Sequence, residues 1–466
     1  MAKKLKSETQ DPTPEFIKSA ARVPEGIEDA IKQYDVLQHD IFDKTKRKDK
    51  DVAKPGVDDN GNETVVNSTE PVNRIGLAFQ QLIVKRRAAF MNLGALTLVA
   101  KPNGTAEESL VAATKAVLDD NKMKFKLKKI ARGVMSEKQA AVLFYSDIET
   151  GPEGKDTPHL KARLLSPKMG DELLPVFDSF GKLQYFGRGY KTRAGDKEFE
   201  HMDIYSSEKI FQWSNESGEV TLNGTVTHKY GKIPIAYFSQ EETEWAIVQA
   251  IIERLEELLS NFGDTNDYNG SPILVARGVI KGFSSKGERG KVLEIEGEQA
   301  DVKYVSWEQA PESIKLEIET LTNLLMSLSQ TPDISSKGMA DLGLDSGVAF
   351  DRVFLDAQLA AQDKLDEDFG EVLQRMVNFI KTAICNVFDT SLKSAIGMKI
   401  EVEVPTFRIN EVSETIDNMM AANGGKPIIS HKTSVAMSGL VEDAEAEFEL
   451  IEAQEDSLGR EIETEI

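Results

Sequence analysis

The chain has 466 residues, enough to bury a large core and to hold more than one domain. Its 78 acidic residues outnumber its 56 basic ones, and the formal net charge of -22 argues against a protein that grips phosphate backbones tightly. The single cysteine, Cys385, allows no disulfide within the chain and sits in an apolar helical pattern. We therefore expect a small core residue and a reducing compartment.

Neither a targeting segment nor a membrane span is predicted. The start, MAKKLKSETQDPTPE, has positive charge without an apolar run behind it, so it does not have the pattern of a signal peptide. The longest apolar stretch, 88–100, is interrupted by Asn92 and Gly94 and is too short to cross a bilayer.

Residues 1–70 mix charges of both signs with Pro, Gly, Asn and Asp, as in KTKRKDKDVAKPGVDDNGNE. This composition buries little apolar surface, so we predict a polar arm, partly disordered, with a short helix near 25–41. From residue 72 the pattern becomes helical in NRIGLAFQQLIVKRRAAFMNL, and further helices are expected near 107–142. The cluster Lys85-Arg86-Arg87 is either a solvated helix face or a contact to DNA or a partner.

Residues 160–240 change to period two. Short runs rich in β-formers, such as LLPVFDSFGKLQYFGRGYKTR and HMDIYSSEKIFQWSN, are separated by Gly, Asn and Ser, which predicts a meander of hairpins. FGRGYK (186–191) has aromatic residues that could stack on bases, but the match to an RNA-binding strand is partial. A hairpin with ordinary cross-strand aromatic pairs is the favoured interpretation.

Two strong helical patterns flank a short β-rich insert. The first runs over TEWAIVQAIIERLEELLSNF (243–262), where apolar side chains share one stripe at helical spacing. That stripe consists of Trp245, Val248, Ile251, Leu255, Leu258 and Phe262. The second has Pro311 in its first turn, ends before Thr331-Pro332, and places apolar residues at alternating steps of four and three. This second stripe, which needs a partner helix, consists of Ile314, Ile318, Leu321, Leu325 and Leu328.

The insert at 271–310 contains three or so short strands, in SPILVARGVIKGF, KVLEIEG and ADVKYVSW. Its two ends are expected to return close together, because one helix precedes it and another follows. Its turn region carries four basic residues: Lys281, Lys286, Arg289 and Lys291.

A glycine-rich loop and a long helix follow. Residues 336–347, SKGMADLGLDSG, hold three glycines, a composition that resists a fixed fold. The next helix is predicted to run to about residue 388, with Gly370 as its weak point, so that any kink is expected there. A strand in KIEVEVPTF, short helices and a Glu-rich tail complete the chain. The fold class is therefore α+β and mainly helical.

Catalytic constellations are nearly absent from the sequence. The five histidines show no metal-ligand spacing with a second His or Cys; they are His39, His159, His201, His228 and His431. GPEGKDT (151–157) lacks the spacing of a phosphate-binding loop, and no G-x-S-x-G elbow occurs. We expect no enzyme activity, no metal and no cofactor, although a nuclease-type carboxylate cluster stays an alternative.

The order of these elements resembles a known family. HKYGKIPIAYF (228–238) leads into the first long helix, and SPIL (271–274) opens the β-insert after it. ISSKGMADLGLDSGVAFDRVF then joins the glycine loop to the long helix through the step Ser346-Gly347-Val348-Ala349. Together with NRIGLAFQQLIVKRRAAF and IISHKTSVAMSGLVEDAEAEFELIEAQE, this order is similar to the portal protein of tailed bacteriophages of the long-tailed type, over most of 71–455.

The resemblance implies a portal fold whose parts follow one another along the chain. After an N-terminal polar arm (1–70), which matches no part of that fold, they are a wing of helices and β-meander (71–242), a first stem helix (243–270), a small β-rich clip (271–310), a second stem helix (311–335), a tunnel loop (336–347), a long kinked helix with a wing strand (348–404), and crown-side helices with an acidic tail (405–466).

The resemblance also implies a function: a homo-dodecameric ring at one capsid vertex, assembled in the host cytoplasm and present in the virion. Double-stranded DNA would pass through it without sequence specificity during packaging and ejection. The implied partners are the terminase large subunit, a head-completion adaptor, tail proteins, and the major capsid and scaffolding proteins, with no membrane. A surplus of carboxylates suits such a conduit, because a channel that repels phosphate does not trap DNA.

Three sets of residues are assigned roles in this hypothesis. The DNA-facing loop residues are Lys337, Met339, Leu342 and Leu344. The clip residues that contact partners are Lys281, Lys286, Arg289 and Lys291, and the ring-assembly residues are Ile314, Ile318, Leu321, Leu325 and Leu328. The alternatives are a metal-dependent nuclease or maturation enzyme of the virion, and a non-ring capsid scaffold component.

Overall fold

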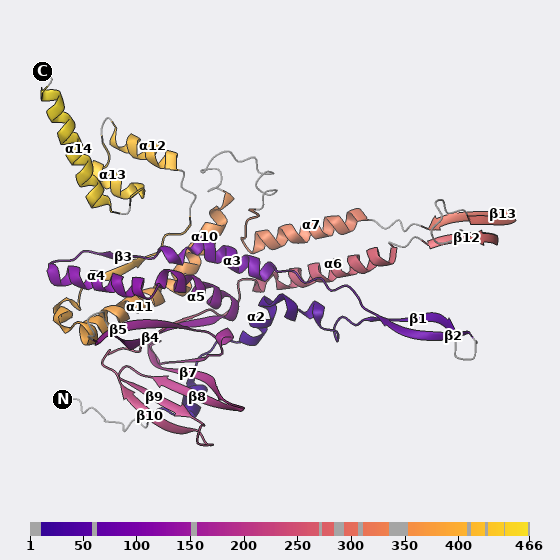
Figure 1. Ribbon diagram of the computed structural model, residues 1–466, viewed down its shortest axis with the longest axis horizontal. Coiled ribbons are helices and arrows are strands. Elements are labelled where there is room, and N and C mark those ends of the chain that lie inside the picture. Colours follow the sequence, from indigo (N-terminus) through magenta and orange to yellow (C-terminus); the bar gives the residue numbers. More distant parts are fainter. Residues whose placement is uncertain are drawn as a thin grey trace. The chain divides into compact units, whose positions relative to one another are not determined.

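A computed structural model describes residues 11–57, 63–150, 156–269, 273–283, 293–305, 311–334, 353–407, 412–424, 427–441 and 443–464 (Figure 1). The chain divides into two compact units, each described by itself. Unit 1 comprises Met1–Pro332 and Ala357–Thr406, and unit 2 comprises Asp333–Asp356 and Phe407–Ile466. Helices and sheets both contribute, as the predicted α+β class requires.

The β-meander predicted from period two is confirmed in unit 1. Five antiparallel strands lie side by side in chain order, because each is joined to the next by a short connection. They are β6 (Glu172–Phe177), β7 (Leu183–Ala194), β8 (Lys197–Tyr205), β9 (Lys209–Ser214) and β10 (Thr221–Thr227). FGRGYK lies within β7, where Tyr190 stacks on His201 of β8 as an ordinary cross-strand pair.

Part of each face of this sheet is buried, and successive side chains of a strand point to opposite faces. On one face, Leu173 and Phe186 join the core of a second sheet, in which β4 (Gln139–Thr150) lies between β11 (Ile235–Ser239) and β5 (Asp156–Leu165). On the other face, Leu174 and Ile204 pack around Ile17. The strand β4 was not predicted; the helical pattern near 107–142 ends at residue 137.

Ile17 belongs to the N-terminal segment, and its burial corrects the prediction that residues 1–70 bury little apolar surface. The helix α1 (Pro14–Ala20) starts at the cap Thr13, whose side chain accepts a hydrogen bond from the Phe16 amide, and has Pro14 in its first turn. Ile17 is fully buried against the sheet. A Cβ on Gly187 would come within 2.6 Å of it, so β7 needs glycine there.

The segment after α1 contains further regular structure. It consists of α2 (Ile27–Tyr34), two single 3₁₀ turns at Val36–Gln38 and Asp40–Phe42, and the hairpin of β1 (Lys50–Val57) and β2 (Glu63–Glu70). The short helix predicted near 25–41 is therefore confirmed at α2.

Helices cover the second sheet and a small strand pair. They are α4 (Thr105–Asp120), α5 (Met123–Glu137) and α11 (Gly370–Ala383), while α3 (Phe79–Met91) packs on α5 and α10 (Leu355–Lys364) precedes α11. The strands β3 (Thr97–Ala100) and β14 (Ile400–Glu403) pair antiparallel, and Ile400 packs with Val377 of α11. A 3₁₀ turn at Leu93–Ala95 and another at Pro167–Met169 complete the connections.

The long helix ends at Phe388, as predicted, and contains two π-helical turns. A π-helical turn at Leu365–Phe369 separates α10 from α11, and a second follows at Ile384–Phe388, before a 3₁₀ segment at Thr390–Ala395. Gly370, the predicted weak point, directly follows the first π turn. Such turns accommodate one extra residue per turn and are a known cause of bends in helices.

The two predicted long helices are present as α6 (Gln249–Asn269), preceded by a 3₁₀ turn at Ala246–Val248, and α7 (Pro311–Leu328). In the described part of the insert between them, β12 (Ile273–Phe283) pairs with β13 (Leu293–Val305). KVLEIEG and ADVKYVSW were expected to form separate strands, but β13 extends through most of both. The register of the β12–β13 pair shifts between Arg277 and Val279, where β13 has extra residues that form a bulge.

Unit 2 contains α12 (Val412–Asn423), α13 (His431–Ser438) and α14 (Ala444–Thr464). The helix α13 packs against both others. Its start is capped by Ser430, whose side chain accepts a hydrogen bond from the Thr433 amide, and its end by Gly439 in the left-handed conformation. The short helices expected after the last strand are confirmed.

Candidate functional site

The helix pair α6 and α7 is the candidate site, because it carries the insert and most of the residues assigned roles from the sequence. The two helices pack on each other. Leu255 of α6 and Leu325 of α7 are almost fully buried. Arg254 Nη2 donates to Glu317 Oε1 at 2.9 Å and joins the helices at their edge.

A second layer lies along α6 and is formed by residues 35–49 and 72–77, which we call the strap. Glu256 Oε1 accepts a hydrogen bond from the Leu77 amide at 2.7 Å and lies 2.6 Å from His39 Nδ1. One turn further on, Ser260 Oγ accepts from the Ile75 amide at 2.9 Å. Glu256 and Ser260, four residues apart on α6, therefore accept hydrogen bonds from backbone amides of residues 72–77, which belong to no helix or strand.

The strap is held most firmly at the C-terminal half of α6. Asp264 accepts hydrogen bonds from Arg47 Nη2 and from the Asn73 amide, both at 2.7 Å. Arg74 Nη2 donates to Asp49 Oδ1 at 2.7 Å and ties the two parts of the strap together. These contacts fix both ends of the β1–β2 hairpin, which starts at Lys50.

His39 is the most buried ionisable group of the strap. Its Nε2 lies 2.7 Å from the Gln33 carbonyl oxygen and its Nδ1 faces the Glu256 carboxylate, so both ring nitrogens meet acceptors. A neutral imidazole has only one N–H group, so the ring donates to both acceptors only when it is protonated. Burial opposes the charged ring, but the hydrogen bond and charge of Glu256 outweigh it, and the pKa of His39 is raised.

A buried charge cluster joins four elements at the base of the helix pair. Glu244, just before α6, accepts from Lys364 Nζ of α10 at 2.9 Å and pairs with Arg87 Nε of α3 at 3.4 Å. Arg87 also donates to the carbonyl of Ser329 at the end of α7. Lys364 makes a second ion pair, with Asp368, at 2.7 Å. Burial disfavours the charged ammonium, but Glu244 and Asp368 outweigh it and raise the pKa of Lys364.

Arg87 belongs to the basic cluster for which a solvated helix face was one of two interpretations. That interpretation is wrong for Arg87, whose side chain is only 10% exposed and paired with Glu244. Lys85 is exposed and Arg86 is half-buried. Successive residues on a helix lie 100° apart, so a run of three spans about 200° and its members point in clearly different directions.

The predicted ring-assembly stripe divides between the inside and the outside of unit 1. Leu325 is fully buried within the subunit, so the assembly role predicted for it does not fit the structure. Leu328 is exposed. The other three members are half-buried: Ile314, Ile318 and Leu321. Most of the stripe is therefore at least partly covered within the subunit.

The other assigned residues lie mostly outside the described residues. Lys281 is in β12, where only the backbone is described. The remaining clip and loop residues belong to segments that are not described: Lys286, Arg289 and Lys291, and Lys337, Met339, Leu342 and Leu344.

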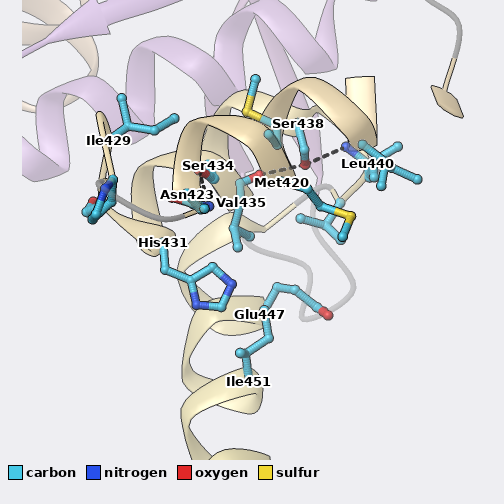
Figure 2. A pocket seen from close by; sticks show the side chains of 16 residues that line it. Met420, Asn423, Ile429, His431, Ser434, Val435, Ser438, Leu440, Glu447 and Ile451 are labelled. Carbon is cyan, nitrogen blue, oxygen red and sulfur yellow. Dashed lines mark hydrogen bonds between the residues drawn. The ribbon is translucent and has the colours of Figure 1, made fainter. Parts of the chain in front are cut away.

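Unit 2 contains a separate cavity of about 750 Å³ between its three helices (Figure 2). Its lining is mainly apolar and includes Met420, Val435 and Ile451. Figure 2 shows His431 on the same side as Glu447 and Ile451, and the His431 ring meets Phe448 edge to face. Asn423 Nδ2 donates to Ser434 Oγ at 2.6 Å, so these polar groups satisfy each other. The cavity therefore offers mainly apolar contact, with His431 and Glu447 among its polar lining residues.

Within the described residues, no group of three or more His, Cys, Asp and Glu is arranged to hold a metal ion. None of the described helices combines the length and apolar character needed to span a membrane. Cys385 is fully buried, as predicted for a core residue, and burial raises the pKa of its thiol.

A family profile described as "Phage portal protein, SPP1 Gp6-like" matches residues 24–460, which is nearly the whole chain. The chain belongs to this family of phage portal proteins. Membership gives the chain the general role of a portal, a structural head-to-tail connector of the virion. It also extends the resemblance seen in the sequence to residues 24–70, which the sequence patterns alone did not place in the portal fold.

Solved structures give a weaker comparison with the portal chain. One similar chain comes from a structure titled "Virion of native gene transfer agent (GTA) particle", and another from the neck of an empty particle of the same kind. Each has 10% sequence identity and a TM-score of 0.41, and covers 77% of the portal chain and 89% of its own. No curated protein sequence matches.

The sequence signals for the portal's strap were present but ambiguous. Asp264 and Asp267 on α6, and Arg47 and Arg74 in the strap, are all charged residues that a sequence pattern assigns to solvent. Only the fold brings Arg47 to Asp264 and Asn73 to Asp267, across 217 and 194 positions of sequence. A charged residue on the polar face of an amphipathic helix gives no signal of its partner.

Proposed function

We propose that the chain assembles into a homo-dodecameric ring at one capsid vertex, through which DNA enters the capsid during packaging and leaves at ejection. The family match over residues 24–460 supports the portal role. The observation that carries the proposal is the pair α6 and α7, which flanks the β12–β13 insert and keeps exposed leucines on its outer side. Aliphatic side chains exposed at regular spacing on a helix are typical of a surface that neighbouring subunits cover.

Negative-stain imaging and light scattering of the purified chain test this proposal. Closed rings with a central hole, and a mass about twelve times that of one chain, are expected. A monomer at every concentration would overturn the ring and favour the alternative of a non-ring scaffold component. Cleavage of DNA by the pure protein with added divalent metal, lost on replacing one carboxylate pair, would favour the alternative of a nuclease or maturation enzyme.

The acidity of the chain supports passage of DNA and not its retention. With a net charge of -22, a ring of many copies repels phosphate wherever carboxylates face the channel. Basic residues in the insert are then available for proteins: we assign Lys281, Lys286, Arg289 and Lys291 to contacts with the terminase large subunit and the head-completion adaptor. Reversing two of these charges should weaken terminase binding and leave the ring intact. Equal terminase affinity would contradict the assignment.

The segment 336–347 is proposed to face the DNA within the channel. It lies in sequence between α7 and the helices α10 and α11, and its glycines lower the cost of changing its backbone angles. Lys337, Met339, Leu342 and Leu344 provide contacts without sequence preference. Deleting Met339 to Gly343 should leave rings and procapsids assembled while stopping packaging or retention of DNA. Particles that fill and hold their genome normally would reduce the segment to a connector.

A further inference from the structure

The solvent-facing side of α5 is a concentrated basic surface in an acidic chain. Residues 121–136, NKMKFKLKKIARGVMS, contain six basic residues and no carboxylate, whereas the whole chain has a net charge of -22. The exposed residues of α5 are basic, with one aromatic residue among them: Lys124, Phe125, Lys128, Lys129 and Arg132. Lys122, at the N-cap of the helix, is also exposed. We call the five exposed basic residues the α5 patch: Lys122, Lys124, Lys128, Lys129 and Arg132.

The patch faces outward because the opposite side of α5 is buried in the core. Apolar side chains at steps of four and three hold the helix in place: Met123, Leu127, Ile130 and Val134, each buried. The helix packs on α3 and β4. On the exposed side, Lys124, Lys128 and Arg132 repeat every four residues, so they form a row with a spacing of about 6 Å along the helix axis. The core therefore fixes which way the basic row points.

The α5 patch makes no ion pair within the described residues. Glu137, the carboxylate of α5 itself, is buried at the far end of the helix and accepts a hydrogen bond from the Lys168 amide. The helix α3 and the turn Leu93–Ala95, which both pack on α5, contain no carboxylate. Lys126, half-buried on α5, has its pKa lowered by burial and then by the charge of Lys161, so the charged neighbour that acts on it is also basic.

The other elements that pack on α5 do contain carboxylates, but none of those described forms an ion pair with the patch. They are Glu28 and Asp29 of α2, Glu107, Glu108, Asp119 and Asp120 of α4, and Asp147 and Glu149 of β4. Glu149 pairs with Lys161 of β5 instead, and the charges of Asp120 and Asp147 also act on Lys161. Glu107 accepts a hydrogen bond from the Asn103 amide. The charged groups of the patch are therefore available to an anionic partner.

The composition of this surface suits phosphate groups better than a protein. The core of a protein–protein interface is depleted in Lys and needs apolar side chains, and the exposed side of α5 offers one, Phe125, which is 62% exposed. Surfaces that bind nucleic acid are instead clusters of Lys and Arg that neutralise phosphates. Flexible ammonium groups act as point charges and do not read base edges, so the contact has no sequence preference.

We infer that the α5 patch binds the phosphate backbone of double-stranded DNA. The choice of double-stranded DNA rests on the proposed function, whereas the affinity for phosphate rests on the patch alone. The acidity of the rest of the chain does not cancel it, because exposed charges further apart than the Debye length of about 8 Å at physiological salt are largely screened. Binding of this kind has a Kd of about 10⁻⁴ to 10⁻⁶ M at physiological salt, weak enough to leave the DNA free to move.

Fluorescence anisotropy of the purified full chain with a labelled DNA duplex, measured over a range of salt concentrations, tests the inference. If each patch residue contacts one phosphate, the logarithm of the binding constant should fall with the logarithm of salt concentration with a slope of about -4.5. The patch variant, Lys124→Gln with Lys128→Gln and Arg132→Gln, should bind about tenfold more weakly or worse and reduce the slope to about -2. Its circular dichroism and melting temperature should match the parent, because all three side chains are exposed.

Two control variants separate the patch from the total charge of the chain. Lys197→Gln with Lys209→Gln and Lys229→Gln removes the same charge at exposed positions in or beside the five-stranded sheet, and should bind DNA like the parent. Lys124→Arg with Lys128→Arg keeps the charge of the patch and should also bind like the parent. A second duplex of unrelated sequence should bind with equal affinity, and a clear preference for one duplex would contradict a contact to phosphates alone.

The remaining outcomes each overturn a different statement. A parent that does not bind DNA, a patch variant that binds like the parent, or equal losses in the patch variant and the charge-matched control would overturn the inference. Patch-dependent binding of polyglutamate without binding of DNA would overturn it in favour of an acidic protein partner. Negative-stain imaging of the same samples separates it from the proposed function. Rings without patch-dependent DNA binding overturn this inference alone, and patch-dependent binding by a chain that forms no rings overturns the ring alone.

Discussion

The Nδ1 atom of His39 lies 2.6 Å from Oε1 of Glu256, and both side chains are less than 5% exposed. The pair joins the N-terminal segment to α6 across 217 positions of sequence. Glu256 also accepts the Leu77 amide, so one carboxylate holds both parts of the strap. A buried ion pair of this kind costs desolvation, and losing one partner costs more than the pair itself contributes.

Stability should depend on pH through His39. Its pKa is raised in the folded chain, so the stabilisation is fully present below the ordinary value of 6.5 and is lost as pH rises through the raised pKa. His39→Gln should therefore lower the melting temperature more at about pH 6 than at about pH 9. Thermal unfolding at both pH values measures this, with His159→Gln on β5 as the control. A loss of equal size at both pH values would contradict a charged His39.

Glu244 should be among the most sensitive positions of unit 1. Glu244→Ala leaves the side chains of Arg87 and Lys364, which are 10% and 17% exposed, without their shared carboxylate. Breaking a buried pair in this way should cost about 3–5 kcal/mol in the free energy of unfolding. Denaturant titration should show less than about 1 kcal/mol for the control Glu371→Ala, which removes an exposed ion pair with Arg375. Similar losses for the two variants would show that the cluster is not energetically coupled.

Ile17 and Gly187 should show non-additive effects. Ile17→Ala should cost about 2–5 kcal/mol, since the side chain is fully buried on the sheet. Gly187→Ala should also destabilise, because its new Cβ would lie 2.6 Å from Ile17 Cγ2, but less so when Ile17 is already Ala. Equilibrium unfolding of the two single variants and the double variant measures the coupling. Phe16→Ala, at an exposed position of the same helix, is the control, and additive losses would argue against the close approach.

Cys385 should react slowly with thiol reagents in the folded chain. The side chain is fully buried, its Sγ–H donates to the Leu392 carbonyl oxygen at 3.4 Å, and burial raises its pKa, so little accessible thiolate is available. Labelling at neutral pH should become fast only in denaturant. Rapid stoichiometric labelling of native protein would place the thiol at the surface instead.

The elements with strong local patterns were predictable from the sequence, whereas those defined by distant partners were not. The helices α6 and α7 follow from apolar periodicity and Pro311, and the meander follows from period two. Ile17 looked like one apolar residue in a polar segment, because its partners Leu174 and Ile204 are more than 150 positions away. The strap contains few apolar residues, and its charges gave no sign that α6 would receive them.

The candidate site was predictable only in part for a related reason. A single apolar stripe on α7 does not reveal whether it meets its own α6 or a neighbouring subunit. The structure buries Leu325 within the subunit and leaves Leu316 and Leu324 exposed, although all three are leucines in one short helix. The π turn before Gly370 likewise depends on packing around Phe369, and glycine content alone does not specify it.

Holding the strap on α6 also sets an order of events during synthesis. The strap leaves the ribosome long before Asp264 exists to receive Arg47 and Asn73. At roughly 5–20 residues per second, about 10–40 seconds separate the two segments. During that interval Ile75, His39 and Arg47 have no α6 to contact, so contacts of such long range are formed late. A nascent chain of this protein is therefore expected to need protection, by chaperones or by earlier helices, until α6 has been completed.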